Sequence, residues 1–133
     1  MNSEDVSFQN MTQKLLEALP ELTSYHDRAL AASENDGEWS GQHIAYEEVM
    51  SKAIKEMLRA EQPDERLLHK IFDFLEMLAK HPEEHVQEVA HNSVCEPICS
   101  DELTLQRARK YMGPTTKDFC KAIVTWEPPA GGR

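Results

Sequence analysis

The side chains best suited to metal binding or nucleophilic chemistry are histidines and cysteines in the second half of this 133-residue chain. His91, Cys95 and Cys99 follow one another at intervals of four residues. Two such ligands on one helix can share an ion, but eight residues span about 12 Å of helix rise and zinc–ligand bonds measure about 2.1–2.3 Å. The three side chains can meet only if Pro97 folds the chain back, so we expect no metal site.

Without a metal, Cys95 and Cys99 are either small buried hydrophobes or a reactive pair at the surface. Cys120 lies close in sequence to Lys117 and Lys121, and neighbouring cations can lower the pKa of a thiol. Nucleophilic catalysis would also require a histidine base and an oxyanion hole. The histidines are all far from Cys120 in the sequence, so we do not assign it a catalytic role.

The remaining motifs do not indicate an enzyme either. His81 and His85 also have an i,i+4 spacing, but Pro82 lies between them, and we interpret both as exposed turn histidines. The chain has no glycine-rich phosphate loop and no CxxC, HExxH or GxSxG sequence, patterns that position reactive groups in several enzyme classes. We therefore expect no catalytic residues, no metal and no cofactor.

The net charge narrows the choice of partners. It is −10, and residues 1–66 hold 14 acidic and 6 basic side chains. An acidic protein is repelled by the phosphates of DNA and RNA, so we expect no nucleic-acid binding. The same charge either attracts a basic partner or serves only to keep the protein soluble.

Composition also bears on location. No apolar run approaches the roughly 20 residues that a membrane-spanning helix requires, and the first ten residues are acidic and polar, unlike a secretory signal. Three cysteines, an odd number, agree with a reducing compartment. We therefore predict a cytoplasmic protein that does not contact the membrane.

The segment 64–80 is the stretch around which the predicted fold is organised. Its leucines, isoleucine and phenylalanines recur at the three- and four-residue spacings of one helical face. Phe72 and Phe74 widen that face, so we expect neighbours on more than one side of the helix. Asp64 is the predicted N-cap, and Lys80 places positive charge near the end of the helix, where the helix dipole favours it.

Other segments show the same helical periodicity, and nothing shows the alternation of a strand. We expect helices at about 6–19, 21–32, 43–60, 82–96, 100–112 and 115–126. The fold class is therefore all-α, a compact bundle of about six to seven helices in one domain at 1–126, with a disordered tail at 127–133. The helices at 64–80 and 82–96 are expected to form an antiparallel pair of HEAT type.

Several positions near the ends of these helices have specific predictions. Pro97 is expected to end or kink the fifth helix. Gly113 is expected to terminate the sixth helix and Pro114 to open the last one. Leu103 and Ala122 are among the apolar residues expected to face the core.

Two stretches carry a pattern that is familiar from other proteins. They are KIFDFLEML (70–78) with HVQEVAHNSVCEPI (85–98), and then YMGPTTKDFCKAIVTW (111–126). Over 64–126 the chain resembles a family of small bacterial helical proteins, some of them similar to immunity proteins encoded beside secreted toxins. The resemblance implies a HEAT-like or bundle fold that binds a toxin tightly, and it assigns no catalytic residue. The positions that carry it are Phe74, Leu75, Glu76, Val94, Glu96, Gly113 and Pro114.

A partner-binding region is predicted around the loop at 33–42, which contains Ser, Asn, Asp and two glycines. Residues 34–48 contain five carboxylates and no lysine or arginine. Trp39 lies inside this run, where it either covers the core or anchors an interface. The predicted partner-binding residues are Glu34, Asp36, Glu38, Trp39, Glu47 and Glu48.

The functional hypothesis combines charge and resemblance. We expect an acidic cytoplasmic binding protein that neutralises a basic protein partner, an immunity protein against a toxin of nuclease type. The alternative is a general helical adaptor or a subunit of a larger assembly, whose acidity serves solubility alone. The sequence does not determine the oligomeric state.

Replacing Trp39 with alanine separates the two interpretations of the loop. If the indole covers the core, the variant loses about 3–5 kcal/mol of unfolding free energy, measured by urea denaturation. If the indole anchors an interface, unfolding is nearly unchanged and binding of the basic partner weakens by about 2 kcal/mol or more, measured by titration calorimetry.

Overall fold

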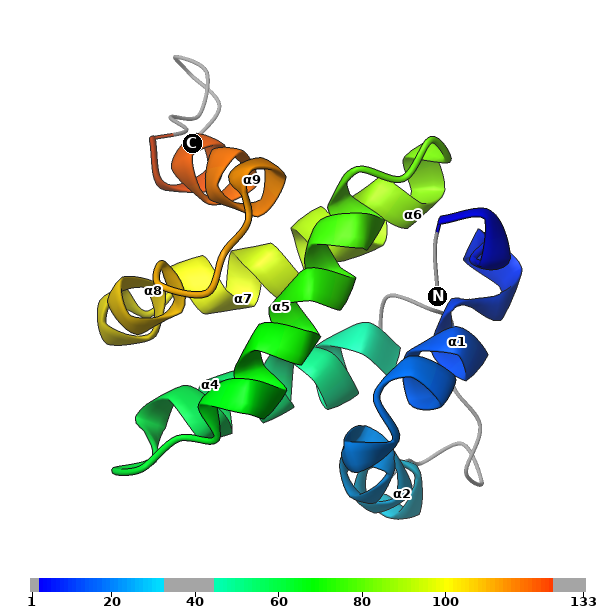
Figure 1. Ribbon diagram of the computed structural model, residues 1–133, viewed down its shortest axis with the longest axis horizontal. Coiled ribbons are helices and arrows are strands. Elements are labelled where there is room, and N and C mark those ends of the chain that lie inside the picture. The colour runs from blue at the N-terminus through cyan, green and yellow to red at the C-terminus, as the bar shows by residue number, and fades with distance from the viewer. Residues whose placement is uncertain (1–2, 33–44, 126–133) are drawn as a thin grey trace.

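The computed structural model describes residues 3–32 and 45–125, and every regular element within these ranges is helical. The all-α prediction is therefore confirmed. In Figure 1, α5 crosses the middle of the molecule, with α1 and α2 on one side and α8 and α9 on the other. Within the described ranges, no helix has the length and apolar character that crossing a membrane requires.

The longer helices are α1 (Met11–Ala18), α2 (Thr23–Ala32), α4 (Lys52–Arg59), α5 (Glu65–Ala79), α8 (Glu102–Ala108) and α9 (Pro114–Thr125). Short ones are η1 (Ser3–Asp5), η2 (Phe8–Asn10), η3 (Pro20–Leu22), α6 (Glu84–Glu88) and α7 (Glu96–Cys99). Two wide π turns, η4 (Glu47–Ser51) and η5 (Val89–Cys95), continue directly into α4 and α7.

The central helix forms as its sequence predicts. Asp64 is the N-cap, and its carboxylate accepts a hydrogen bond from the backbone N–H of Leu67 at 3.1 Å. Phe72 and Phe74 are only 1 % and 6 % exposed, so α5 is covered on more than one side. The helix contacts α4, α6, η5 and α9. Burial of this broad apolar face is the main favourable contribution to the fold.

The chain turns back after α5 and continues through α6, η5 and α7, which run antiparallel to it (Figure 1). Of the two outcomes expected at Pro97, an end or a kink, the first does not occur, because the helical run reaches Cys99. A proline ring clashes with the carbonyl four residues earlier in a regular helix. The wide turn η5 lies immediately before this position, where an extra residue in the turn can accommodate the ring.

His81 contradicts its sequence interpretation. It is only 4 % exposed, whereas His85 is largely exposed, as predicted. The backbone N–H of Glu83 donates to His81 Nδ1 at 2.9 Å, so Nε2 carries the proton and donates to the Val6 carbonyl at 2.7 Å. The imidazole thereby joins the N-terminal segment to the turn after α5, which the sequence spacing of 75 residues could not reveal.

Leu103 and Ala122 also contradict their predictions, because both are exposed; Leu103 is 47 % exposed. Residues two apart on a helix point in roughly opposite directions, since each residue turns the chain by about 100°. Leu105 and Cys120 are buried. Leu103 and Ala122, each two residues away from one of them, must therefore face outward.

A carboxylate from α5 holds the start of α9. Glu76 accepts hydrogen bonds from the backbone N–H groups of Thr115 and Thr116, both at 2.9 Å, and from the Thr116 hydroxyl at 2.8 Å. These donors are at the N-terminus of α9, where the helix dipole favours a negative charge. Burial alone would raise the pKa of Glu76, but the donors from Thr116 and Thr115 hold the pKa below its usual value.

Gly113 makes room for this contact. A Cβ atom at that position would lie 2.6 Å from Glu76 Cδ and 2.7 Å from Glu76 Oε1. Pro114 then opens α9, as predicted, whereas α8 already ends at Ala108. Gly113 is therefore required for the close approach of Glu76, and it does not mark the end of α8.

Glu76→Gln and Gly113→Ala should each lower the free energy of unfolding at pH 7 by about 1–3 kcal/mol. The first replaces a charged acceptor with a neutral amide, and the methyl group of the second displaces the carboxylate from its donors. The contribution of Glu76 is complete above its unfolded pKa of about 4.3 and is lost as the pH falls through the lower folded pKa. The deficit of Glu76→Gln in urea denaturation should therefore shrink below about pH 4.

A double-mutant cycle supplies the control. In a Glu76→Ala background the atoms that the new methyl group would meet are absent, so Gly113→Ala should then cost little. An equal cost of Gly113→Ala in both backgrounds would contradict this explanation of the glycine.

Candidate functional site

Only part of the predicted partner-binding region falls within the described residues. Glu34, Asp36, Glu38 and Trp39 lie outside them. Glu47 and Glu48 open the wide turn η4, where Glu47 is exposed and Glu48 is partly exposed. Glu48 forms an i,i+4 salt bridge with Lys52.

The wide turn is firmly attached to the rest of the protein. Val49, Met50 and Ser51 are buried within it, and the turn packs against α2 and η5. Just before it, Tyr46 is fully buried and its hydroxyl donates to the Met11 carbonyl at 2.8 Å. The carboxylates of Glu47 and Glu48 therefore project from a rigid part of the fold.

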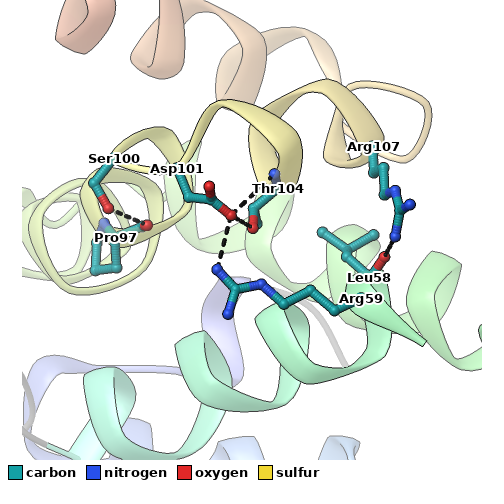
Figure 2. A network of polar contacts seen from close by, with 7 residues as sticks. All are labelled: Leu58, Arg59, Pro97, Ser100, Asp101, Thr104 and Arg107. Carbon is teal, nitrogen blue, oxygen red and sulfur yellow. Dashed lines mark hydrogen bonds and ion pairs between the residues drawn. The ribbon is translucent and has the colours of Figure 1, made fainter.

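Polar contacts join the end of α4 to α8, as Figure 2 shows. Arg59 donates to Asp101 Oδ2 at 2.9 Å, and the same oxygen accepts from the Thr104 hydroxyl and its backbone N–H. Arg59 first and Thr104 second lower the pKa of Asp101 to about 2. Arg107 donates to the Leu58 carbonyl at 2.7 Å and so satisfies an acceptor at the C-terminus of α4.

A surface cleft of about 420 Å³ lies beside these contacts, lined by the end of α4, the connection to α5, and α8 with the turn that follows it. Three of its cations are engaged in polar contacts: Arg59 with Asp101, Arg107 with the Leu58 carbonyl and Lys110 with Glu65. Glu65 accepts from both Lys110 and the Tyr111 hydroxyl, and these donors, Lys110 first, lower the pKa of Glu65. These three cations therefore serve structural contacts, which makes them poor candidates for holding a ligand.

A second hollow, of about 450 Å³, lies between α8 and α9. We call it the basic pocket, and its lining residues are Leu105, Arg109, Met112, Lys117, Cys120, Lys121 and Val124. Its described lining residues include three cations and no acidic side chain, in a chain with a net charge of −10. Lys117, Cys120 and Lys121 lie close together in the sequence, but their spacing alone does not predict a pocket, because the facing residues come from α8 and the turn after it.

The three cysteines converge beside this pocket, and all are free thiols. Cys120 makes side-chain hydrogen bonds with Cys95 and Cys99. The hydrogen bond with Cys95 and burial raise the pKa of Cys120 to about 12, although the hydrogen bond with Cys99 and the charge of Arg109 act in the opposite direction. The lowered pKa that the nearby lysines suggested is therefore wrong, because the hydrogen bond with Cys95 and burial outweigh the nearby cations.

The thiol of Cys99 behaves similarly. Its hydrogen bond with Cys120, together with burial, raises its pKa. His91 belongs to other contacts: its ring packs edge-on against Phe119 with the centroids 5.0 Å apart, and its Nδ1 lies 2.9 Å from the Asn92 side-chain oxygen. Among the residues described, no three histidine, cysteine or acidic side chains are placed to hold a metal ion.

Within the described residues, the regular elements are all helical, and a basic pocket stands out in a chain whose net charge is −10. The chain belongs to the family described as a domain of unknown function, DUF7674, whose family model matches residues 12–127. No curated protein and no solved structure matches it. The family match includes the contact between Glu76 and α9 as well as both hollows.

Cys120 should react slowly with iodoacetamide at pH 8, because a pKa of about 12 leaves little thiolate. Its rate, followed by peptide mass spectrometry, should keep rising by about tenfold per pH unit between pH 8 and 10. The same thiol in the chain unfolded by guanidinium is the control, and its rate should level off near pH 9. Levelling near pH 9 in the folded protein would mean that burial alone slows the reaction.

Proposed function

We propose that this protein is an acidic binding protein that neutralises a basic protein partner, a toxin domain of nuclease type. The observation that carries the proposal is the net charge of −10 together with the run of five carboxylates at 34–48. A nuclease must grip phosphates, so its substrate-binding surface is expected to be basic. A complementary acidic surface would speed association and favour this partner over others.

The described part of the acidic region is suited to this role. Glu47 is exposed on η4, a turn whose buried residues hold it against α2 and η5. Charged groups on rigid elements lose less conformational freedom on binding than groups on loose ones. We place the centre of the interface at residues 34–48, with Trp39 as its apolar anchor.

The first step is to search the neighbouring genes for a toxin-like protein, and charge reversal at Glu47 and Glu48 then tests the proposal with that protein as partner. The double variant Glu47→Lys/Glu48→Lys should slow association by about tenfold or more and weaken its dependence on salt, measured by stopped-flow or surface plasmon resonance. Dissociation should change much less, because charges at the edge of an interface act mainly on the association rate.

A matched control changes the net charge by the same amount elsewhere. Glu84 and Glu102 are exposed on α6 and α8, so Glu84→Lys/Glu102→Lys should leave the association rate near that of the unmodified protein. Equal slowing by both double variants would show that total charge, not this surface, guides the partner. If the protein binds no neighbouring toxin and instead copurifies stably with a host assembly, the toxin proposal fails.

A further inference from the structure

The basic pocket is built from two facing stripes of side chains. Lys117, Cys120, Lys121 and Val124 are spaced i, i+3, i+4 and i+7, so they lie on one face of α9. Opposite them stand Leu105, Arg109 and Met112 from α8 and the turn that follows it. The helices themselves are held by other neighbours, α8 by α4 and α7, and α9 by α5, η5 and α7. The hollow therefore lies between two helices whose positions are fixed by contacts with other parts of the fold.

Two cations of the pocket, Arg109 and Lys117, differ from two cations of the neighbouring cleft. In the cleft, Arg59 pairs with Asp101 and Lys110 with Glu65. Arg109 and Lys117 form no salt bridge within residues 3–32 and 45–125. Two cations that face one hollow without a counter-charge repel each other, and a bound anion would remove that repulsion.

The remaining wall is aliphatic. Leu105, Met112 and Val124 supply apolar surface, and Val124 is 54 % exposed. The hydrogen bond with Cys95 and burial raise the pKa of Cys120, so this thiol stays protonated and contributes an uncharged group to the wall of the pocket. No aromatic ring is among the lining residues described, so this part of the wall offers an aliphatic chain better contact than a nucleotide base, which stacks on aromatic side chains.

We propose that the basic pocket binds a small aliphatic carboxylate, with its charged end at Arg109 and Lys117 and its chain against Leu105, Met112 and Val124. The planar guanidinium of Arg109 can hold both oxygens of a carboxylate, and Lys117 supplies a second positive charge. A volume of about 450 Å³ lies within the range of small-molecule sites. This site is independent of the acidic partner-binding surface and does not rest on the proposed function.

Octanoate is the probe for this proposal, with octylamine and octanol as probes of opposite and zero charge. In titration calorimetry the 133-residue protein should bind octanoate. Its affinity for octylamine and for octanol should be at least about tenfold weaker. With ¹³C-methyl-labelled methionine, the Met112 resonance, assigned from Met112→Leu, should shift on titration. The resonances of Met11 and Met50, buried elsewhere in the core, should stay in place.

Variants connect the binding to the pocket. Arg109→Gln and Lys117→Gln should each weaken octanoate by at least about tenfold, the effect of losing one charge-assisted hydrogen bond. Val124→Asp should abolish binding, because it replaces part of the apolar wall with a carboxylate that repels the negatively charged ligand. Arg59→Gln, which removes a paired cation from the neighbouring cleft, is the matched control and should leave octanoate affinity unchanged.

Four results would overturn the proposal. They are no octanoate binding at millimolar concentration, equal binding of octanol, an unchanged affinity in both Arg109→Gln and Lys117→Gln, and an equal loss in Arg59→Gln. A fifth is a dimer in light scattering that Val124→Asp dissociates while octanoate does not bind. That result would show that a second copy of the chain occupies this face. Circular dichroism at each step confirms that the variants remain folded.

Discussion

The contact between Glu76 and the first turn of α9 is the constraint on which the C-terminal half of the fold depends. It joins a carboxylate on the central helix to the unpaired N–H groups of a helix that begins 38 residues later. Helix N-terminal donors need an acceptor when they are partly buried, and Glu76 supplies one with a charge that matches the helix dipole. Because this anchors α9 against α5, it also positions the stripe of α9 that forms one wall of the basic pocket.

Other polar contacts in the protein follow the same logic, in which a side chain satisfies a backbone group of a distant element. Tyr46 donates to the Met11 carbonyl, His81 to the Val6 carbonyl and Arg107 to the Leu58 carbonyl. Each satisfies an acceptor in or near the apolar core, where an unpaired group would be costly. The apolar core supplies most of the stabilisation. These few hydrogen bonds add specificity, because each one fixes the position of one element against another.

Charge is distributed unevenly in a way that suggests two kinds of surface. Many cations on the described helices are engaged locally, for example Lys52 with Glu48 and Lys70 with Glu21. Such exposed pairs contribute little stability. The two charges within each pair cancel, so the excess negative charge comes from other acidic residues. Arg109 and Lys117 in the basic pocket differ, because they form no salt bridge within the described residues. A net negative charge and a hollow lined by cations thus coexist in one small domain.

The sequence by itself determined the all-α class, the central helix and its cap at Asp64, because periodicity and capping act between residues a few positions apart. It did not predict the burial of His81, the raised pKa of Cys120 or the exposure of Leu103, and no local pattern could have done so. The pKa of a thiol depends on which side chains pack against it, and a pocket requires two helices to face each other. Only the tertiary structure decided these features, since it brings together groups that lie far apart along the chain.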